Sequence, residues 1–211
     1  MLFRPSSSRG ILTSERWIHS RRTFSNMSYN DKKYKNFGPL HTLNDDILFP
    51  GYTIPKHEHK RLDILGYLID GQLEHWDSCG SLNEASVGQV QHMWCGESIW
   101  HTEKCISETP ARYLQIWFTP NQIVPAPYYE IYNRPSNEFT PLNIKFKNDM
   151  TVRAGLLTTQ YTTSTVFKAY LYVISGSCQV GDQHLNEGDG GELFDETIVP
   201  KTSPHIMLFE M

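Results

Sequence analysis

Two pairs of potential metal ligands stand out in the first half of this 211-residue chain. His57 and His59 are separated by one residue, and so are His101 and Glu103. In a β-strand, side chains two residues apart point to the same face, so each pair can direct both of its side chains into one interior. If the two pairs lie on neighbouring strands, they converge on one point. Three imidazoles and one carboxylate suit a first-row divalent metal, with one or two positions open for water, substrate or dioxygen.

One pair of this kind is a weak signal, because histidines are common on surface strands. The second pair, on another segment flanked by glycine turns, is what favours a metal site. The remaining histidines that we considered have no matching arrangement, and we expect structural or surface roles for His41, His75, His92, His184 and His205. Of these, His75 is the residue that a pocket would include.

The segments around the two pairs have the pattern of short strands. Apolar runs such as Leu62–Ile69 and Tyr113–Thr119 are separated by turn signals, and Asp70-Gly71 between two apolar runs is typical of a hairpin. Many short strands at this spacing predict an all-β protein built as a sandwich or barrel. A weak internal repeat, in which 67–73 resembles 172–178 and a second glycine turn follows each, predicts two related barrels in tandem.

The predicted organisation is an N-terminal metal-binding barrel at 1–120, a connecting segment at 121–148 and a C-terminal barrel at 149–211. Prolines such as Pro125, Pro127 and Pro141 interrupt regular elements in the connecting segment. The positions of the second barrel that correspond to the four potential ligands fall near residues that bind transition metals poorly: Thr162, Ser164, Lys201 and Ser203. We therefore expect one metal ion per chain, in the N-terminal barrel.

Composition narrows the class of protein. Hydrophobic residues make up 39% and charged residues 20% of the chain, which supports a packed core, and the net charge is −4. No long basic block is present, so direct nucleic-acid binding is not expected. No apolar run approaches the roughly 18 residues of a membrane span. The four cysteines have no CxxC spacing, which predicts free thiols in a reducing compartment.

The N-terminal region allows two interpretations. Residues 1–30 are rich in arginine and serine and poor in acids, a composition typical of a mitochondrial transit peptide. The alternative is that this region forms ordinary N-terminal strands of a cytoplasmic protein, with a nuclear location as the second possibility. We favour strands, because of the family resemblance described next.

The segments HEHKRLDILGYLIDGQLEHWDSCGS and VGQVQHMWCGESIWHTE resemble the two cupin motifs of the pirin family of bicupins, which includes the quercetin 2,3-dioxygenase-like pirins. The likeness covers nearly the whole chain, and 22–46 resembles the first strands of the family. The resemblance implies a bicupin, that is, two tandem β-barrels of the jelly-roll type with a metal-free C-terminal barrel. It also implies iron(II) as the usual metal, although the same ligand set accepts manganese, nickel, copper or zinc. The ligands that it implies are His57, His59, His101 and Glu103.

The resemblance supports an oxidoreductase, a quercetinase-like dioxygenase that cleaves a flavonol-like substrate with dioxygen. Glu103 would loosen from the metal and act as the general base for the substrate hydroxyl. The second ring nitrogens of the histidines need acceptors, for which Asp63 or Gln91 are candidates. Asp63 and Ser98 depart from the family pattern near the predicted pocket, which leaves the substrate open.

Two alternatives remain at this point. The first is a pirin-like, redox-sensitive regulatory protein that binds the metal and a protein partner but has no turnover. The second is a degenerate cupin without metal. In each case the resemblance favours a monomer.

Overall fold

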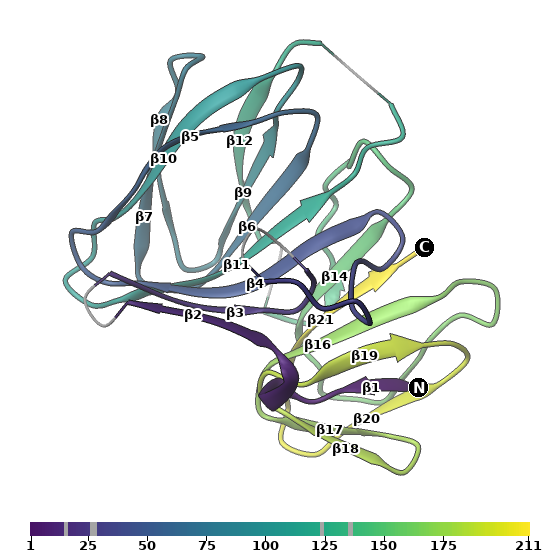
Figure 1. Cartoon of the computed structure of the whole chain (residues 1–211). Helices are drawn as coiled ribbons and strands as arrows, with labels where there is room; N and C mark the ends of the chain where they lie inside the picture. The colour runs from purple at the N-terminus through teal and green to yellow at the C-terminus, as the bar shows by residue number, and fades with distance from the viewer. Residues whose placement is uncertain (15–16, 26–28, 123–124, 135–136) are drawn as a thin grey trace. The chain divides into compact units, whose positions relative to one another are not determined.

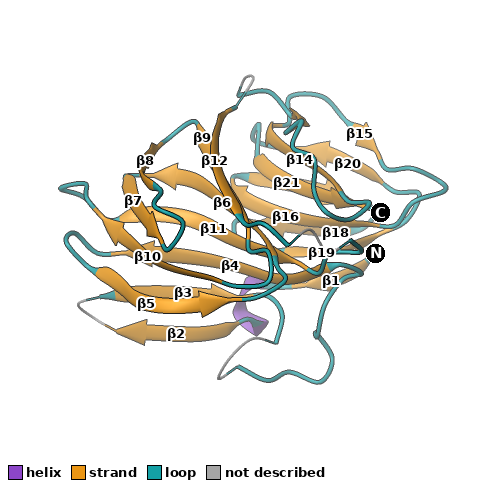
Figure 2. Cartoon of the chain, turned by 90° about the horizontal axis from the view of Figure 1, so that it is seen from above, coloured by secondary structure: helices purple, strands orange, loops and turns teal. Residues whose placement is uncertain are grey.

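The computed structural model describes residues 1–14, 17–25, 29–122, 125–134 and 137–211, and almost all of its regular structure is β-strand (Figures 1 and 2). Within these ranges the single helix is a 3-10 turn at Ser6–Ser8. None of the described residues forms a helix long and apolar enough to cross a bilayer. The predicted all-β class is confirmed.

The chain divides into two compact units. The N-terminal unit consists of Gly10–Arg134 and Phe146–Asn148, and the C-terminal unit consists of Met1–Arg9, Pro135–Lys145 and Asp149–Met211. The first residues of the chain thus group with its last third, a division that differs from the predicted boundaries.

The N-terminal unit contains two sheets. Its strands are β2 (Gly10–Ser14), β3 (Ile18–Arg22), β4 (Leu40–Leu48), β5 (Thr53–His59), β6 (Asp63–Asp70), β7 (Gln72–Asp77), β8 (Leu82–Ser86), β9 (Gln89–Trp94), β10 (Ile99–Cys105), β11 (Ala111–Phe118) and β12 (Tyr128–Asn133). One sheet has the order β12-β9-β6-β11-β4-β3-β2, and the other has the order β5-β10-β7-β8. Strand β12 comes from the segment predicted as a connection, where it pairs with β9 beyond the interrupting prolines.

The C-terminal unit repeats this two-sheet plan. Its strands are β1 (Leu2–Arg4), β13 (Thr140–Pro141), β14 (Thr151–Leu156), β15 (Tyr161–Thr162), β16 (Ala169–Ser175), β17 (Ser177–Val180), β18 (Gln183–Asn186), β19 (Gly190–Leu193), β20 (Thr197–Pro200) and β21 (His205–Glu210). The sheets have the orders β1-β19-β16-β21-β14-β13 and β15-β20-β17-β18. Strand β1 pairs antiparallel with β19, which explains why the start of the chain belongs to this unit.

Glycine turns at matching places carry the chain from one sheet to the other in both units. Gly71 joins β6 to β7 with a φ of +73°, and Gly176 joins β16 to β17 with a φ of +74°. A second pair, Gly88 and Gly188, has φ values of +90° and +81°. These left-handed conformations favour glycine, which accounts for the repeat seen in the sequence. The predicted hairpin at Asp70-Gly71 is wrong, however, because the turn forms but β6 and β7 lie in different sheets.

Each unit has its own hydrophobic core between its two sheets. In the N-terminal unit, one cluster combines residues of both sheets: Leu48, Leu68, Leu73, Ala85, Cys105, Ala111 and Tyr113. The corresponding cluster of the C-terminal unit is Leu157, Ala169, Leu171, Val173, Cys178, Val180, Leu185, Leu193, Ile198, Ile206 and Leu208. All four cysteines have free thiols, as predicted, and only Cys79 is exposed.

Candidate metal centre

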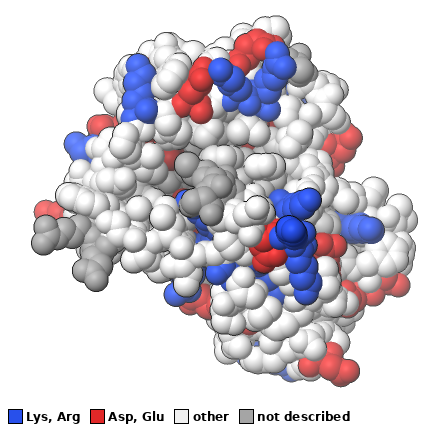
Figure 3. Space-filling model, in the orientation of Figure 1, with Lys and Arg blue, Asp and Glu red and all other residues white. Residues whose placement is uncertain are grey.

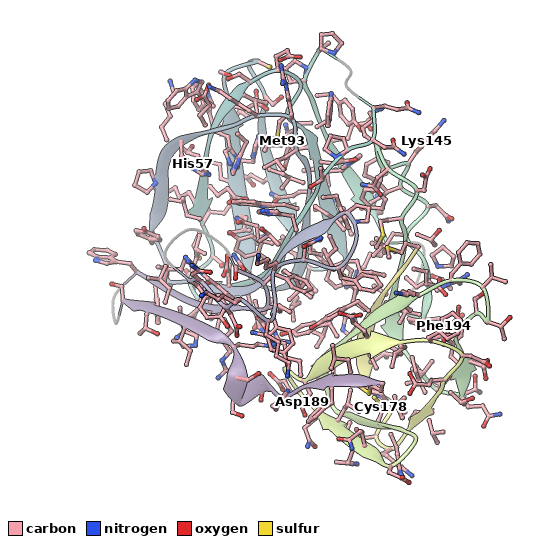
Figure 4. All side chains as sticks on the ribbon, turned by 45° about the vertical axis from the view of Figure 1, so that its right-hand side comes forward. His57, Met93, Lys145, Cys178, Asp189 and Phe194 are labelled. Carbon is pink, nitrogen blue, oxygen red and sulfur yellow. The ribbon has the colours of Figure 1, made fainter. Side chains whose placement is uncertain are left out.

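Three histidines of the N-terminal unit meet across two neighbouring strands. Strand β5 carries His57 and His59, strand β10 carries His101, and the antiparallel register places His101 opposite His57 (His57 is labelled in Figure 4). On β10 the inward side chains Ile99, His101 and Glu103 are buried and alternate with more exposed neighbours, as the strand period requires. The sequence spacing therefore directs the three imidazoles to the same interior.

The nitrogen atoms of these imidazoles lie at the separation that one shared cation needs. The Nε2 atom of His57 is 2.9 Å from that of His101 and 3.1 Å from that of His59. For metal–nitrogen bonds of roughly 2.1 Å, two ligand nitrogens are about 3 Å apart at a right angle and about 3.4 Å apart at a tetrahedral angle. All three ligand atoms lie within 4.8 Å of one another. Among the described residues, no other group of three or more His, Cys, Asp or Glu side chains is arranged in this way.

Burial keeps the imidazoles of His59 and His101 neutral. Burial, together with the nearby imidazoles of His57, His59 and His75, lowers the pKa of His101 to about 2. Burial and the charge of His57 lower the pKa of His59 to about 4. A neutral imidazole has a free lone pair, which is the form that binds a metal. The donor set therefore fits a divalent first-row metal at neutral pH.

Glu103, the fourth predicted ligand, is buried on the same face of β10 but is not part of the three-histidine group. Its Oε2 atom accepts hydrogen bonds from the hydroxyl of Tyr113 at 3.2 Å and from Nε2 of Gln115 at 3.1 Å. Burial and the charge of Asp46 raise its pKa to about 7, against the lowering effect of these two hydrogen bonds. Its role as a metal ligand stays a prediction.

A cavity of about 580 Å³ opens beside the histidines. Its lining includes His57 and His59. The apolar part of the lining is Leu12, Ile18, Tyr52, Ile54, Pro55 and Trp117, and the polar part includes Ser20, Arg22, Asn44, Asp46 and Gln115. Four of these residues come from β2 and β3, namely Leu12, Ile18, Ser20 and Arg22. The N-terminal region thus forms strands that wall the cavity, as we expected from the family resemblance.

Several polar residues that line the cavity are buried, among them Ser20, Arg22, Asn44 and Asp46. Burial, together with the charge of Asp45, raises the pKa of Asp46 to about 7. Asp46 and Gln115 were not among the site residues predicted from the sequence. Gln115 could have been identified from the sequence, because it is a polar residue inside an otherwise apolar run. Asp46 follows Asp45 in a segment that gave no indication of which strand face would be buried.

The partners of the second ring nitrogens differ from the prediction. Nδ1 of His57 bonds to the carbonyl oxygen of Pro55 at 2.8 Å, and Nδ1 of His101 lies 3.4 Å from Nδ1 of His75. Asp63, one predicted acceptor, accepts instead from Nε2 of His92 at 2.6 Å. The other predicted acceptor is Gln91, whose side-chain oxygen packs against Gly66, where a Cβ atom would lie only 2.7 Å from it. His75 therefore takes the place that was predicted for these residues.

The chain is similar to known proteins over most of its length. The Pirin family profile matches residues 3–118, and the profile described as the quercetinase C-terminal cupin domain matches residues 143–211. A pirin-like protein from Caulobacter vibrioides is 30% identical over 205 residues, which cover 89% of this chain and 88% of that protein. A protein named quercetin 2,3-dioxygenase from Escherichia coli strain K12 is 27% identical over 212 residues, with 92% of each chain covered.

Solved structures show the same fold. The crystal structure of YhhW from Escherichia coli superposes with a TM-score of 0.93 at 25% identity and covers 99% of this chain and 96% of its own. A second structure, of the bacterial pirin YhhW in complex with nickel(II), has a TM-score of 0.92 at 25% identity and covers 99% of this chain and 97% of its own. The predicted cupin architecture is confirmed by these matches.

Proposed function

The chain belongs to the pirin family, and from this premise we propose that it is a mononuclear metal-dependent dioxygenase of the quercetin 2,3-dioxygenase type. The observation that carries the proposal is the group of three imidazoles whose Nε2 atoms lie together beside a cavity of about 580 Å³. Cavities of about 300–1,000 Å³ are typical of small-molecule sites.

The residues that would hold the metal are His57, His59 and His101, and we propose Glu103 as the fourth ligand and iron(II) as the metal. A bound divalent metal acts as a Lewis acid and lowers the pKa of a coordinated hydroxyl. Glu103 would be the general base that accepts the proton of that hydroxyl, because its carboxylate lies on the same buried face of β10 as His101. Tyr113 and Gln115 hold the carboxylate in place through their hydrogen bonds.

The cavity supports an aromatic substrate that carries hydroxyl groups. Its apolar wall, which includes Tyr52 and Trp117, offers contact to flat rings, and Asn44, Asp46 and Gln115 offer hydrogen-bond partners to hydroxyls. On the face shown in Figure 3, acidic and basic side chains are interspersed. The cytoplasmic location and the monomeric state stay predictions.

The test combines metal analysis with oxygen uptake. The full chain is loaded anaerobically with iron(II), manganese(II), nickel(II) or copper(II), the metal content is measured, and oxygen consumption is followed with quercetin and a panel of other flavonols. The His101→Ala variant removes one ligand, and His184→Ala, at an exposed position of β18, is the matched control.

We expect one metal ion per chain and oxygen uptake that disappears in His101→Ala but persists in His184→Ala. A fully loaded protein that consumes no oxygen with any flavonol would overturn the enzymatic proposal in favour of the regulatory alternative. A protein that binds none of the four metals would overturn both.

A further inference from the structure

A buried aspartate and histidine lie directly behind His101, on the neighbouring strand β7. Nε2 of His75 is 3.0 Å from Oδ2 of Asp77, and Nδ1 of His75 is 3.4 Å from Nδ1 of His101. The relative exposures of His75, Asp77 and His101 are 1%, 0% and 2%. These three side chains therefore form a hydrogen-bonded row in the order Asp77, His75 and His101. The row ends at the Nε2 atom of His101, which is directed toward the proposed metal.

The position of Asp77 in this row is set by the backbone that follows it. Its Oδ1 atom accepts hydrogen bonds from the backbone N–H of Cys79 at 2.8 Å and of Ser81 at 3.2 Å. Burial by itself would raise the pKa of Asp77, but the hydrogen bonds from His75, Cys79 and Ser81 lower it below its ordinary value. Asp77 is consequently an ionised carboxylate, which can accept hydrogen bonds but cannot donate them.

The ring of His75 is held by stacking as well as by hydrogen bonding. It lies parallel to the ring of Tyr129, at 3.9 Å between centroids and 9° between planes. Tyr129 comes from β12 in the other sheet of the N-terminal unit, so the two sheets together fix the plane of His75. The ring can then present Nε2 to Asp77 and Nδ1 to His101 at the same time.

The direction of the hydrogen bonds along the row follows from these partners. Because the carboxylate of Asp77 only accepts, Nε2 of His75 carries the proton. Neutral His75 then has a lone pair on Nδ1 and can only accept there, so Nδ1 of His101 must donate. A neutral His101 with its proton on Nδ1 has its lone pair on Nε2, which is the atom that lies 2.9 Å from Nε2 of His57.

We propose that Asp77 and His75 are positioning residues that fix the tautomer of His101 and thereby present its Nε2 lone pair to the metal. The inference rests on the proposed metal site and deepens it. Partners of this kind, which bind the second nitrogen of a metal-bound histidine, typically contribute 10–100-fold to metal affinity.

The sharpest test is Asp77→Asn. This substitution should reverse the direction of the hydrogen bonds from residue 77 through His75 to His101, and it keeps the shape of the side chain. The two backbone N–H groups of Cys79 and Ser81 need an acceptor, so they hold the amide oxygen and turn the NH₂ group toward His75. His75 must then accept at Nε2 and donate at Nδ1, and His101 must accept at Nδ1 and carry its proton on Nε2. In the metal-free protein, ¹⁵N NMR of the imidazole nitrogens should report the Nδ1–H form of His101 in the unsubstituted chain and the Nε2–H form in Asp77→Asn.

Metal affinity gives a second readout, measured as nickel(II) competition against a chromophoric chelator. We expect Asp77→Asn to lose affinity by roughly 10–100-fold. His75→Phe keeps a ring to stack on Tyr129 but has no acceptor, so it should also lose affinity, whereas His75→Gln can accept from His101 and donate to Asp77 and should retain most of it. Glu74→Gln makes the same charge change on the opposite face of β7 and should bind nickel(II) normally.

The proposal is overturned if His101 keeps the Nδ1–H form in Asp77→Asn, or if His75→Phe and His75→Gln bind nickel(II) equally well. The second comparison decides the matter even if Asp77→Asn does not fold. The NMR readout on metal-free protein does not depend on catalysis. An inactive enzyme with the expected tautomers would therefore contradict the proposed function and leave this inference standing.

Discussion

The buried carboxylate of Glu103 lowers the stability of the metal-free protein, so its removal should stabilise the fold. Glu103 is 6% exposed, and its pKa is raised from an ordinary 4.5 to about 7 by burial and by the charge of Asp46. The substitution Glu103→Gln keeps the shape and an oxygen that can accept from Tyr113 and Gln115, but it removes the charge. We expect this variant to be more stable than the unsubstituted protein above neutral pH.

The magnitude follows from the two pKa values of Glu103. A carboxyl whose pKa is higher in the folded state contributes stability below its unfolded-state pKa, and that contribution is lost as the pH rises through the folded-state pKa. With values of 4.5 and about 7, the loss is about 1 kcal/mol at pH 5 and about 3 kcal/mol at pH 8. The charge of Asp46 supplies part of the shift of the Glu103 pKa, so Glu103→Gln and Asp46→Asn together should gain less than the sum of the two single variants.

The assay is urea unfolding with a chelator present, followed by tryptophan fluorescence at several pH values between 5 and 8. Glu74→Gln, on the opposite face of the neighbouring strand, is the matched control and should change the free energy of unfolding by less than about 0.5 kcal/mol. A gain in Glu103→Gln that is equally large at pH 5 and pH 8, or no gain at pH 8, would refute the reasoning. If Glu103 is the fourth ligand, the same variant should bind nickel(II) more weakly, so the gain should shrink when metal replaces the chelator.

Three further predictions concern other parts of the chain. Alanine at any of the three proposed ligands, His57, His59 or His101, should abolish stoichiometric metal in elemental analysis, whereas His184→Ala should leave it unchanged. Gly155→Ala should destabilise the C-terminal unit by about 3 kcal/mol or more, measured by thermal unfolding. The reason is that Gly155 has a φ of +139° and that a Cβ there would lie 2.1 Å from the carbonyl oxygen of Glu138. The folded variant should still bind one metal ion. Iodoacetamide at pH 8 should modify Cys79 first in mass spectrometry, since the other three thiols are buried, and rapid labelling of all four would contradict the described packing.

The sequence by itself determined those features that depend on neighbouring residues. The alternation of side chains along a strand placed His57 with His59 and His101 with Glu103 on common faces before any pairing was known. The glycine turns could also be predicted from the sequence, because a left-handed φ is a requirement of the single residue that adopts it. The family resemblance then supplied the fold of nearly the whole chain.

The tertiary structure decided which strands became neighbours, and this is a property of residues far apart in the chain. Pairing of β7 with β10 placed Asp77 opposite His101 and brought His75 behind the site, where the sequence analysis had expected Asp63 or Gln91. Pairing of β1 with β19 moved the first residues into the C-terminal unit. The raised pKa of Glu103 likewise depends on burial between two sheets. No local pattern encodes such contacts, because their energy comes from packing and desolvation that exist only once the sheets have assembled.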